Sequence, residues 1–127
     1  MADRDRSPVT IRIEGMVLHT HHGVSDAERE LGQRMLFDLE LEVPECGATS
    51  SDLVEETVDY GELAELVAEL ATAESRLTLE RLIDLIAREV LVRYPVSSVR
   101  VRATKPEPPV PFTMDGASVE LTLSDGD

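Results

Sequence analysis

One lysine is the residue of this sequence best suited to proton transfer. Lys105 is the only lysine among 12 basic residues, and the other 11 are arginine. Arginine stays charged at any ordinary pH, whereas the amine of a lysine can give and take a proton. Four prolines follow within the next six residues, and their fixed φ angles make the loop stiff. Lys105 is therefore a candidate acid–base group; the alternative is a rigid connector whose lysine only contacts solvent.

Two further polar side chains lie at the starts of predicted helices. Glu80 falls in a first helical turn, where free backbone N–H groups favour a charged carboxylate. Such a carboxylate can bind a ligand that offers N–H groups beside a carbonyl, but helix-end glutamates are also common without a ligand. Tyr60 opens the earlier helix, where its hydroxyl can contact a bound polar group or simply lie at a surface or subunit interface.

Three histidines and one glutamate lie in the segment before the second predicted strand. His19 and His21 would point the same way on a strand, but no cysteine and no obvious third ligand is near, so we expect no metal site. His22 and Gly23 are expected to form a turn, and Glu28 is expected on a solvated loop. The sequence contains neither a Ser-His-Asp constellation nor a glycine-rich loop that would hold phosphate.

Hydropathy patterns predict the elements that position these residues. Alternating apolar residues predict four strands, and i, i+3, i+4 spacing predicts two helices, giving the order ββααββ. Asp59 and Glu62 form a capping-box pattern at the first helix, and Thr78 is the expected N-cap of the second. The fold class is therefore α+β, a four-stranded antiparallel sheet with two helices on one face. The expected strands are 9–18, 35–43 (ended by Pro44), 99–103 and 119–123, and the expected helices start near 60 and span 79–93.

The opposite face of the sheet is expected to be wet, because its strand positions carry charges of both signs. These positions are Arg12, Glu14, Asp38, Glu40, Glu42, Arg100, Arg102 and Glu120.

Composition limits the function classes. A chain of 127 residues fits one domain, expected over 9–124, with disordered tails at 1–8 and 125–127. The formal charge of −14 argues against binding to nucleic acid or to an anionic membrane surface. Cys46 is the only cysteine, so an internal disulfide and a multi-cysteine metal site are excluded. The start of the chain has no apolar signal core, and we expect a cytoplasmic protein.

Four short motifs occur in a fixed order over about residues 9–124. Each is weak alone, but together, with the ββααββ order, they resemble the dihydroneopterin aldolase family. The single lysine falls on the catalytic lysine of that family. The motifs are His22-Gly23 with Glu28 and Gly32-Gln33; Thr57-Val58-Asp59-Tyr60-Gly61-Glu62; Leu79-Glu80-Arg81-Leu82; and Thr104-Lys105-Pro106 with Pro109-Val110-Pro111.

The resemblance implies a tunnelling fold, in which the sheets of four subunits form a barrel and two rings stack into a homo-octamer with active sites between subunits. It implies an aldehyde-lyase of folate biosynthesis that cleaves 7,8-dihydroneopterin into 6-hydroxymethyl-7,8-dihydropterin and glycolaldehyde. No cofactor, metal or Schiff base is expected, because the imine of the pterin ring takes up the electrons. An epimerase of dihydroneopterin or its triphosphate, and a non-catalytic pterin-binding module, are the alternatives.

The resemblance also implies roles for individual residues. Lys105 is the implied acid–base group. Tyr60, which would come from the adjoining subunit, and Glu28 are expected to reach the side-chain hydroxyls of the substrate. Asp59 and the segment Phe112-Thr113-Met114 depart from the residues usual in the family. The implied substrate-binding residues are Glu80 for the pterin N–H groups, Leu79 for its carbonyl, Thr57 and Val58 from the adjoining subunit, Val24 as a pocket wall, and His22.

Overall fold

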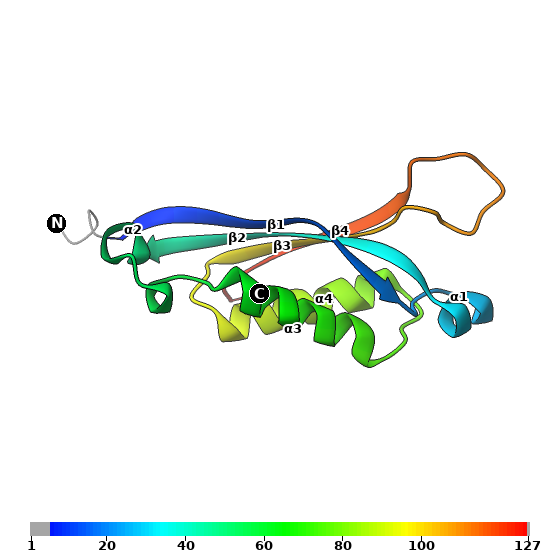
Figure 1. Cartoon of the computed structure of the whole chain (residues 1–127), viewed down its shortest axis with the longest axis horizontal. Coiled ribbons are helices and arrows are strands. Elements are labelled where there is room, and N and C mark those ends of the chain that lie inside the picture. The colour runs from blue at the N-terminus through cyan, green and yellow to red at the C-terminus, as the bar shows by residue number, and fades with distance from the viewer. Residues whose placement is uncertain (1–5, 127) are drawn as a thin grey trace.

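The computed structural model describes residues 6–126 and has nine elements (Figure 1). The main order ββααββ is confirmed. Within the described residues, no helix is long and apolar enough to cross a bilayer. The elements are β1 (Ser7–Thr20), α1 (Asp26–Leu31), β2 (Gln33–Cys46), α2 (Ala48–Ser51), the 3-10 helix η2 (Val54–Glu56), α3 (Tyr60–Ala73), α4 (Leu79–Arg93), β3 (Ser98–Lys105) and β4 (Ala117–Ser124).

The two expected tails differ from the structure at their inner ends. Ser7 and Pro8 belong to β1, and Ser7 is paired with Cys46 of β2. The backbone N–H of Asp125 donates to the carbonyl of Ser97 at 3.0 Å. Residues 1–5 and 127, the outer parts of the expected tails, lie outside the described residues.

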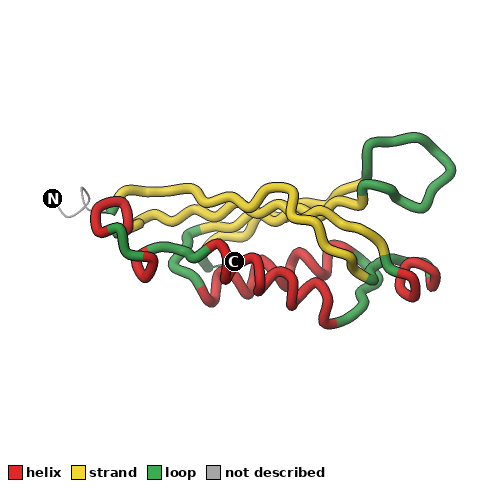
Figure 2. Tube along the Cα trace, viewed as in Figure 1, coloured by secondary structure: helices red, strands yellow, loops and turns green. Residues whose placement is uncertain are grey.

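The strands form one antiparallel sheet in the order β1-β2-β3-β4, and α3 and α4 cover one of its faces (Figure 2). Strand β2 lies inside the sheet, and its alternate residues from Met35 to Val43 are buried against the helices. Pro44 does not end β2 as expected. The pairing with β1 shifts between Ser7 and Val9, and this irregularity accommodates a residue that has no N–H to donate.

The helices begin where the sequence predicts. The Asp59 carboxylate accepts the N–H groups of Gly61 and Glu62, at 3.0 and 3.3 Å. The reciprocal half of the expected capping box is absent among the described contacts, and the Glu62 carboxylate instead accepts the hydroxyl of Tyr94 at 3.2 Å. Because Tyr94 follows the end of α4, this bond shows that the two helices run in opposite directions.

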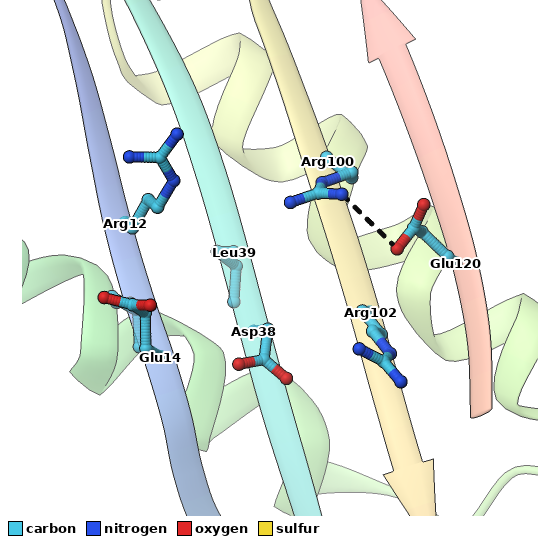
Figure 3. Close-up of a pocket in the computed structure, with 8 residues that line it drawn as sticks. Arg12, Glu14, Asp38, Leu39, Arg100, Arg102 and Glu120 are labelled. Atoms are coloured by element: carbon cyan, nitrogen blue, oxygen red, sulfur yellow. Dashed lines mark ion pairs between the residues drawn. The ribbon is translucent and has the colours of Figure 1, made fainter. Parts of the chain in front are cut away.

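The face of the sheet away from the helices is polar, as predicted, and Figure 3 looks onto it. Arg12, Glu40 and Arg100 are neighbours in one row of the register, and Glu40 pairs with the two arginines at 2.9 and 3.2 Å. Arg100 also pairs with Glu120 at 3.6 Å. Because exposed ion pairs each add little to the free energy of unfolding, the main effect of these charges is to keep this face of the sheet hydrated.

Candidate active site

Lys105 and Glu28 form a close ion pair at one end of the molecule. Lys105 is the last residue of β3, and its Nζ donates to Glu28 Oε2 at 2.6 Å. The two side chains are only 14% and 11% exposed. A charge-assisted bond of this length between two mostly buried groups fixes both side chains in place.

Glu28 does not lie on a solvated loop, as expected from the sequence, but in the short helix α1. Ser25 is the N-cap: its hydroxyl accepts the N–H of Glu28 at 3.2 Å and donates to Glu28 Oε1 at 2.9 Å. The N–H of Ser25 donates to the same oxygen at 3.2 Å. The Ser-x-x-Glu spacing is a capping-box pattern, so the sequence did contain a signal for this helix.

Gly23 lets the carboxylate approach the main chain. A Cβ atom at this position would lie 2.5 Å from Cδ of Glu28, closer than two carbons can pack. The side chain of Glu28 therefore fills the space that a larger residue at position 23 would occupy.

The electrostatics of Glu28 follow from these contacts. Burial by itself would raise the pKa of the carboxyl, but the hydrogen bonds from Lys105 and from the backbone and hydroxyl of Ser25 lower it to about 2. Glu28 is thus an anion at every ordinary pH and can only accept hydrogen bonds.

A pocket of about 320 Å³ opens beside Lys105. It contains four of the predicted site residues on three different elements or loops. Glu80 lies in the first turn of α4 and is exposed, while Leu79 beside it is buried. The residues that line the pocket are Val24, Leu77, Thr78, Leu79, Glu80, Lys105, Ala117, Ser118 and Val119.

Three other predicted residues lie at the opposite end of the helix pair. Tyr60 begins α3 and is 72% exposed, Thr57 lines a separate hollow with Tyr94, and Val58 is buried. Helix α3 has 14 residues and so is about 20 Å long. Because α3 and α4 are antiparallel, Tyr60 and Glu80 lie at opposite ends of this pair, and one chain does not bring them together (Figure 1).

His22, which was predicted to bind substrate, does not line the pocket beside Lys105. The side chain is fully buried, and both ring nitrogens are used within the chain. Nε2 lies 2.6 Å from the carbonyl of Ala71, and Nδ1 accepts the N–H of Arg76 at 2.9 Å. Burial lowers the pKa of His22 more than the hydrogen bond to Ala71 raises it.

The other two histidines also contact main chain. His19 Nε2 lies 3.2 Å from the carbonyl of Leu31, and His21 Nδ1 lies 3.0 Å from that of Arg29. In residues 6–126 no group of three His, Cys, Asp or Glu side chains could hold a metal ion.

Besides Ser25, two residues near the site, Gln33 and Ser118, were not predicted as site residues. Gln33 donates to the carbonyl of His22 at 2.8 Å and lies 3.5 Å from Glu28 Oε2. Ser118 of β4 lines the pocket opposite the start of α4. Gln33 was noted only as part of a motif, and nothing in the local pattern of Ser118 distinguishes it from other polar strand residues.

Comparisons with known proteins agree with this architecture. The family described as "FolB: Dihydroneopterin aldolase" matches residues 11–122. The dihydroneopterin aldolase of Methylorubrum extorquens is 34% identical over 128 residues, covering 100% of this chain and 94% of that relative. The one from Bacillus subtilis is 34% identical over 113 residues, covering 88% of this chain and 94% of that relative.

Solved structures show the same fold. Dihydroneopterin aldolase of E. coli in complex with neopterin has a TM-score of 0.83 and 25% identity, covering 91% of this chain and 99% of that one. A urate oxidase from Bacillus sp. TB-90 has a TM-score of 0.69 at 14% identity, covering 91% of this chain and 47% of that one, which shows only that the tunnelling fold is shared. The sequence matches extend over nearly the whole chain, and the chain therefore belongs to the dihydroneopterin aldolase family, a family of lyases.

Proposed function

We propose that this chain cleaves 7,8-dihydroneopterin into 6-hydroxymethyl-7,8-dihydropterin and glycolaldehyde. One observation carries the proposal: the Lys105 amine lies 2.6 Å from Glu28 at a pocket whose lining also includes the exposed residue Glu80. The pocket thus combines a proton-transfer group with a group that recognises N–H donors. The neopterin named in the complex of the E. coli relative supports a pterin as the ligand.

Glu80 is suited to bind the flat edge of a pterin. Its carboxylate lies in the first turn of α4 and has two oxygens to accept the amino and ring N–H groups. The backbone near Leu79 can donate to the adjacent pterin carbonyl. Val24, Leu77 and Val119 supply apolar surface for the ring.

The reaction needs only proton transfer from the protein. A base takes the proton of the second side-chain hydroxyl, the bond between the first and second side-chain carbons breaks, and glycolaldehyde leaves. The electron pair enters the ring imine and forms an enamine, and an acid then protonates the carbon that remains on the ring. One proton is taken and one is returned, so a single amine that is neutral at the start of the reaction can serve both steps.

Lys105 is the group that we assign to this proton transfer. Glu28, ionised because its pKa is about 2, holds the Lys105 amine and can also accept a hydrogen bond from a substrate hydroxyl. The prolines after Lys105 restrict the loop that follows the strand, so little reorganisation is needed during the reaction.

The rest of the site comes from a second subunit in this proposal. Tyr60, Thr57 and Val58 lie about one helix length from Glu80 within the chain, yet Tyr60 is largely exposed. Strands β1 and β4 are the sheet edges, and edges of this kind commonly pair with another copy. A barrel of four sheets, stacked as a homo-octamer, would place Tyr60 of one copy beside Lys105 of the next.

Epimerisation is the second candidate, because re-addition of glycolaldehyde after cleavage inverts a hydroxyl centre. Lys105 favours net cleavage, since it can protonate the enamine before re-addition.

Release of glycolaldehyde from dihydroneopterin supports the aldolase, a new stereoisomer without glycolaldehyde supports the epimerase, and binding without turnover supports a pterin-binding module.

The decisive experiment is this product assay on wild-type, Lys105→Ala and Arg34→Ala proteins. Lys105→Ala should lower turnover by about 10²–10⁴-fold while neopterin affinity stays within about tenfold. Arg34 of β2 is the matched control, because it is an exposed cation that pairs with Glu107, in the loop that follows Lys105, at 3.4 Å. Full activity of Lys105→Ala would remove the assigned role.

A further inference from the structure

The pocket is lined by residues of β3 and β4 and by two walls that are distant from each other in sequence. Val24, just after β1, supplies one wall, and the segment Leu77–Glu80, at the start of α4, supplies the other. Val24, Leu77 and Thr78 lie in connecting segments, and Leu79 and Glu80 are the first two residues of α4. Contacts between the two connecting segments therefore help to set the separation of the walls.

Those contacts lie directly beside the walls and centre on His22. The N–H of Arg76 donates to His22 Nδ1, and the N–H of Gly23 donates to the carbonyl of Arg76, both at 2.9 Å. His22 and Gly23 immediately precede Val24, and Arg76 immediately precedes Leu77. Two hydrogen bonds thus join the walls at their bases.

Two further hydrogen-bond contacts of His22 connect it to α3 and to the start of β2. Its Nε2 meets the carbonyl of Ala71 in α3 at 2.6 Å, and its own carbonyl accepts the Gln33 amide at 2.8 Å. The ring is fully buried, so each of these polar groups depends on its protein partner.

The hydrogen bonds select one form of the ring. A backbone N–H can only donate, so Nδ1 must present a lone pair to Arg76. A carbonyl can only accept, so Nε2 must carry the hydrogen toward Ala71. His22 is accordingly a neutral imidazole with its hydrogen on Nε2.

We propose that His22 is a positioning residue that joins the two pocket walls through Nδ1 and so sets the affinity of the pocket for its pterin. The pterin as ligand rests on the proposed function; the joining of the walls does not. Loss of the Nδ1 acceptor should loosen the base of the pocket, while loss of the Nε2 donor should affect mainly the contact with α3.

Two substitutions separate these contacts, because asparagine can place an acceptor near Nδ1 and glutamine a donor near Nε2. We expect His22→Gln to raise the neopterin dissociation constant at least about tenfold and His22→Asn to stay within about threefold of wild type, by calorimetry. If His22 only filled space in the core, asparagine would not restore neopterin affinity better than glutamine does. His19→Gln is the matched control, since His19 is exposed, lies near the carbonyl of Leu31 and the ring of His21, and does not line the pocket.

Hydrogen exchange tests the same claim without ligand. The Arg76 and Gly23 amides should exchange at least about tenfold faster in His22→Gln than in wild type or His22→Asn. Equal affinity and equal exchange in folded His22→Gln and wild type would overturn the inference. Should wild type fail to bind neopterin, the proposed function falls, and the exchange result still decides the joining of the walls.

The wild-type protein provides a measurement that does not depend on a variant folding. Nitrogen-15 NMR of the His22 ring should show the hydrogen on Nε2 and a bare Nδ1 at neutral pH. A hydrogen on Nδ1 would contradict the bond to Arg76 and with it the inference.

Discussion

The two ends of the α3–α4 helix pair differ in how completely one chain builds them. At the start of α4, Lys105 and Glu28 are mostly buried and bonded to each other, and Ser25 binds the second oxygen of Glu28. At the start of α3, Tyr60 is 72% exposed. One end is a preorganised charged pair, and the other is a surface.

The difference shows which tasks a single chain can perform. Fixing two charges requires burial and several donors, and the fold of one chain supplies them at Lys105. An exposed tyrosine about 20 Å away cannot join this pair without another copy.

Mixing two inactive variants tests the contrast between the two ends most strongly. Lys105→Ala and Tyr60→Ala should each lower turnover by about 10²–10⁴-fold, because each removes one side of the site. After subunits are exchanged at a 1:1 ratio, about a quarter of the sites would receive both native side chains, and turnover should return to about a quarter of wild type. Product formation before and after exchange is the measurement.

The control for the mixture uses the double variant. When wild-type protein exchanges subunits with Lys105→Ala/Tyr60→Ala, turnover should fall in proportion to the fraction of sites that contain one wild-type and one variant subunit. If exchange is shown by mass spectrometry and the two single variants stay inactive together, both side chains act within one chain and the contrast between the ends is wrong.

Glu80→Ala should lower neopterin affinity by about a hundredfold, since it removes a charged acceptor of two N–H groups. Calorimetry measures this effect, and Glu80→Gln should recover little of it because an amide offers one acceptor and a competing donor. Asp84→Ala is the matched control on the same helix, where Asp84 pairs with Arg88 at 2.9 Å. Equal affinities of Glu80→Ala and wild type would remove Glu80 from the pocket.

Acid should destabilise the Lys105 end in two steps. The pKa of His22 is lowered in the fold, so the unfolded chain binds more protons and stability falls as the pH drops below about 6.5. The charged or titratable groups that act on this ring are Arg76, His21 and Lys105. His22→Asn should remove this first step from urea unfolding curves recorded at fixed protein concentration.

The second step belongs to Glu28. Its pKa is about 2 in the fold and 4.5 ordinarily, so the stability it adds is complete above pH 4.5 and disappears as the pH falls toward 2. The loss should be on the order of 2 kcal/mol. Glu28→Gln should flatten the curve below pH 4.5, whereas Glu30→Gln, at an exposed position of the same helix, should leave it unchanged.

Removal of the helix N-caps should have the smallest effect, and the loss of stability should be the same at both ends of the helix pair. Asp59 caps α3 and Thr78 caps α4, each through one side chain. Replacing either by alanine should lower the free energy of unfolding by about 1 kcal/mol, measured by urea denaturation. A much larger loss at Thr78 would show that the preorganised end also carries more of the stability.

The sequence predicted the regular elements well because their signals are local. Alternation in 99–103 and the Thr78 cap identified β3 and α4, and α4 spans Leu79–Arg93 as predicted. The sequence-based prediction missed the short helix α1, whose start depends on hydrogen bonds of side chains. Glu28 was assigned to a loop because one turn of helix has too little apolar periodicity to be recognised, although Ser25 carried a capping signal.

By itself, the sequence determined the four strands, the two long helices and the one lysine at a strand end, because strand and helix periods act over a few residues. Only the folded chain shows that Glu28 meets Lys105, 77 residues away, that His22 is buried and hydrogen-bonded to the main chain, and that Tyr60 stands apart. Such contacts depend on strand register and helix packing, which bring distant segments together and bury them, and no local pattern contains that information.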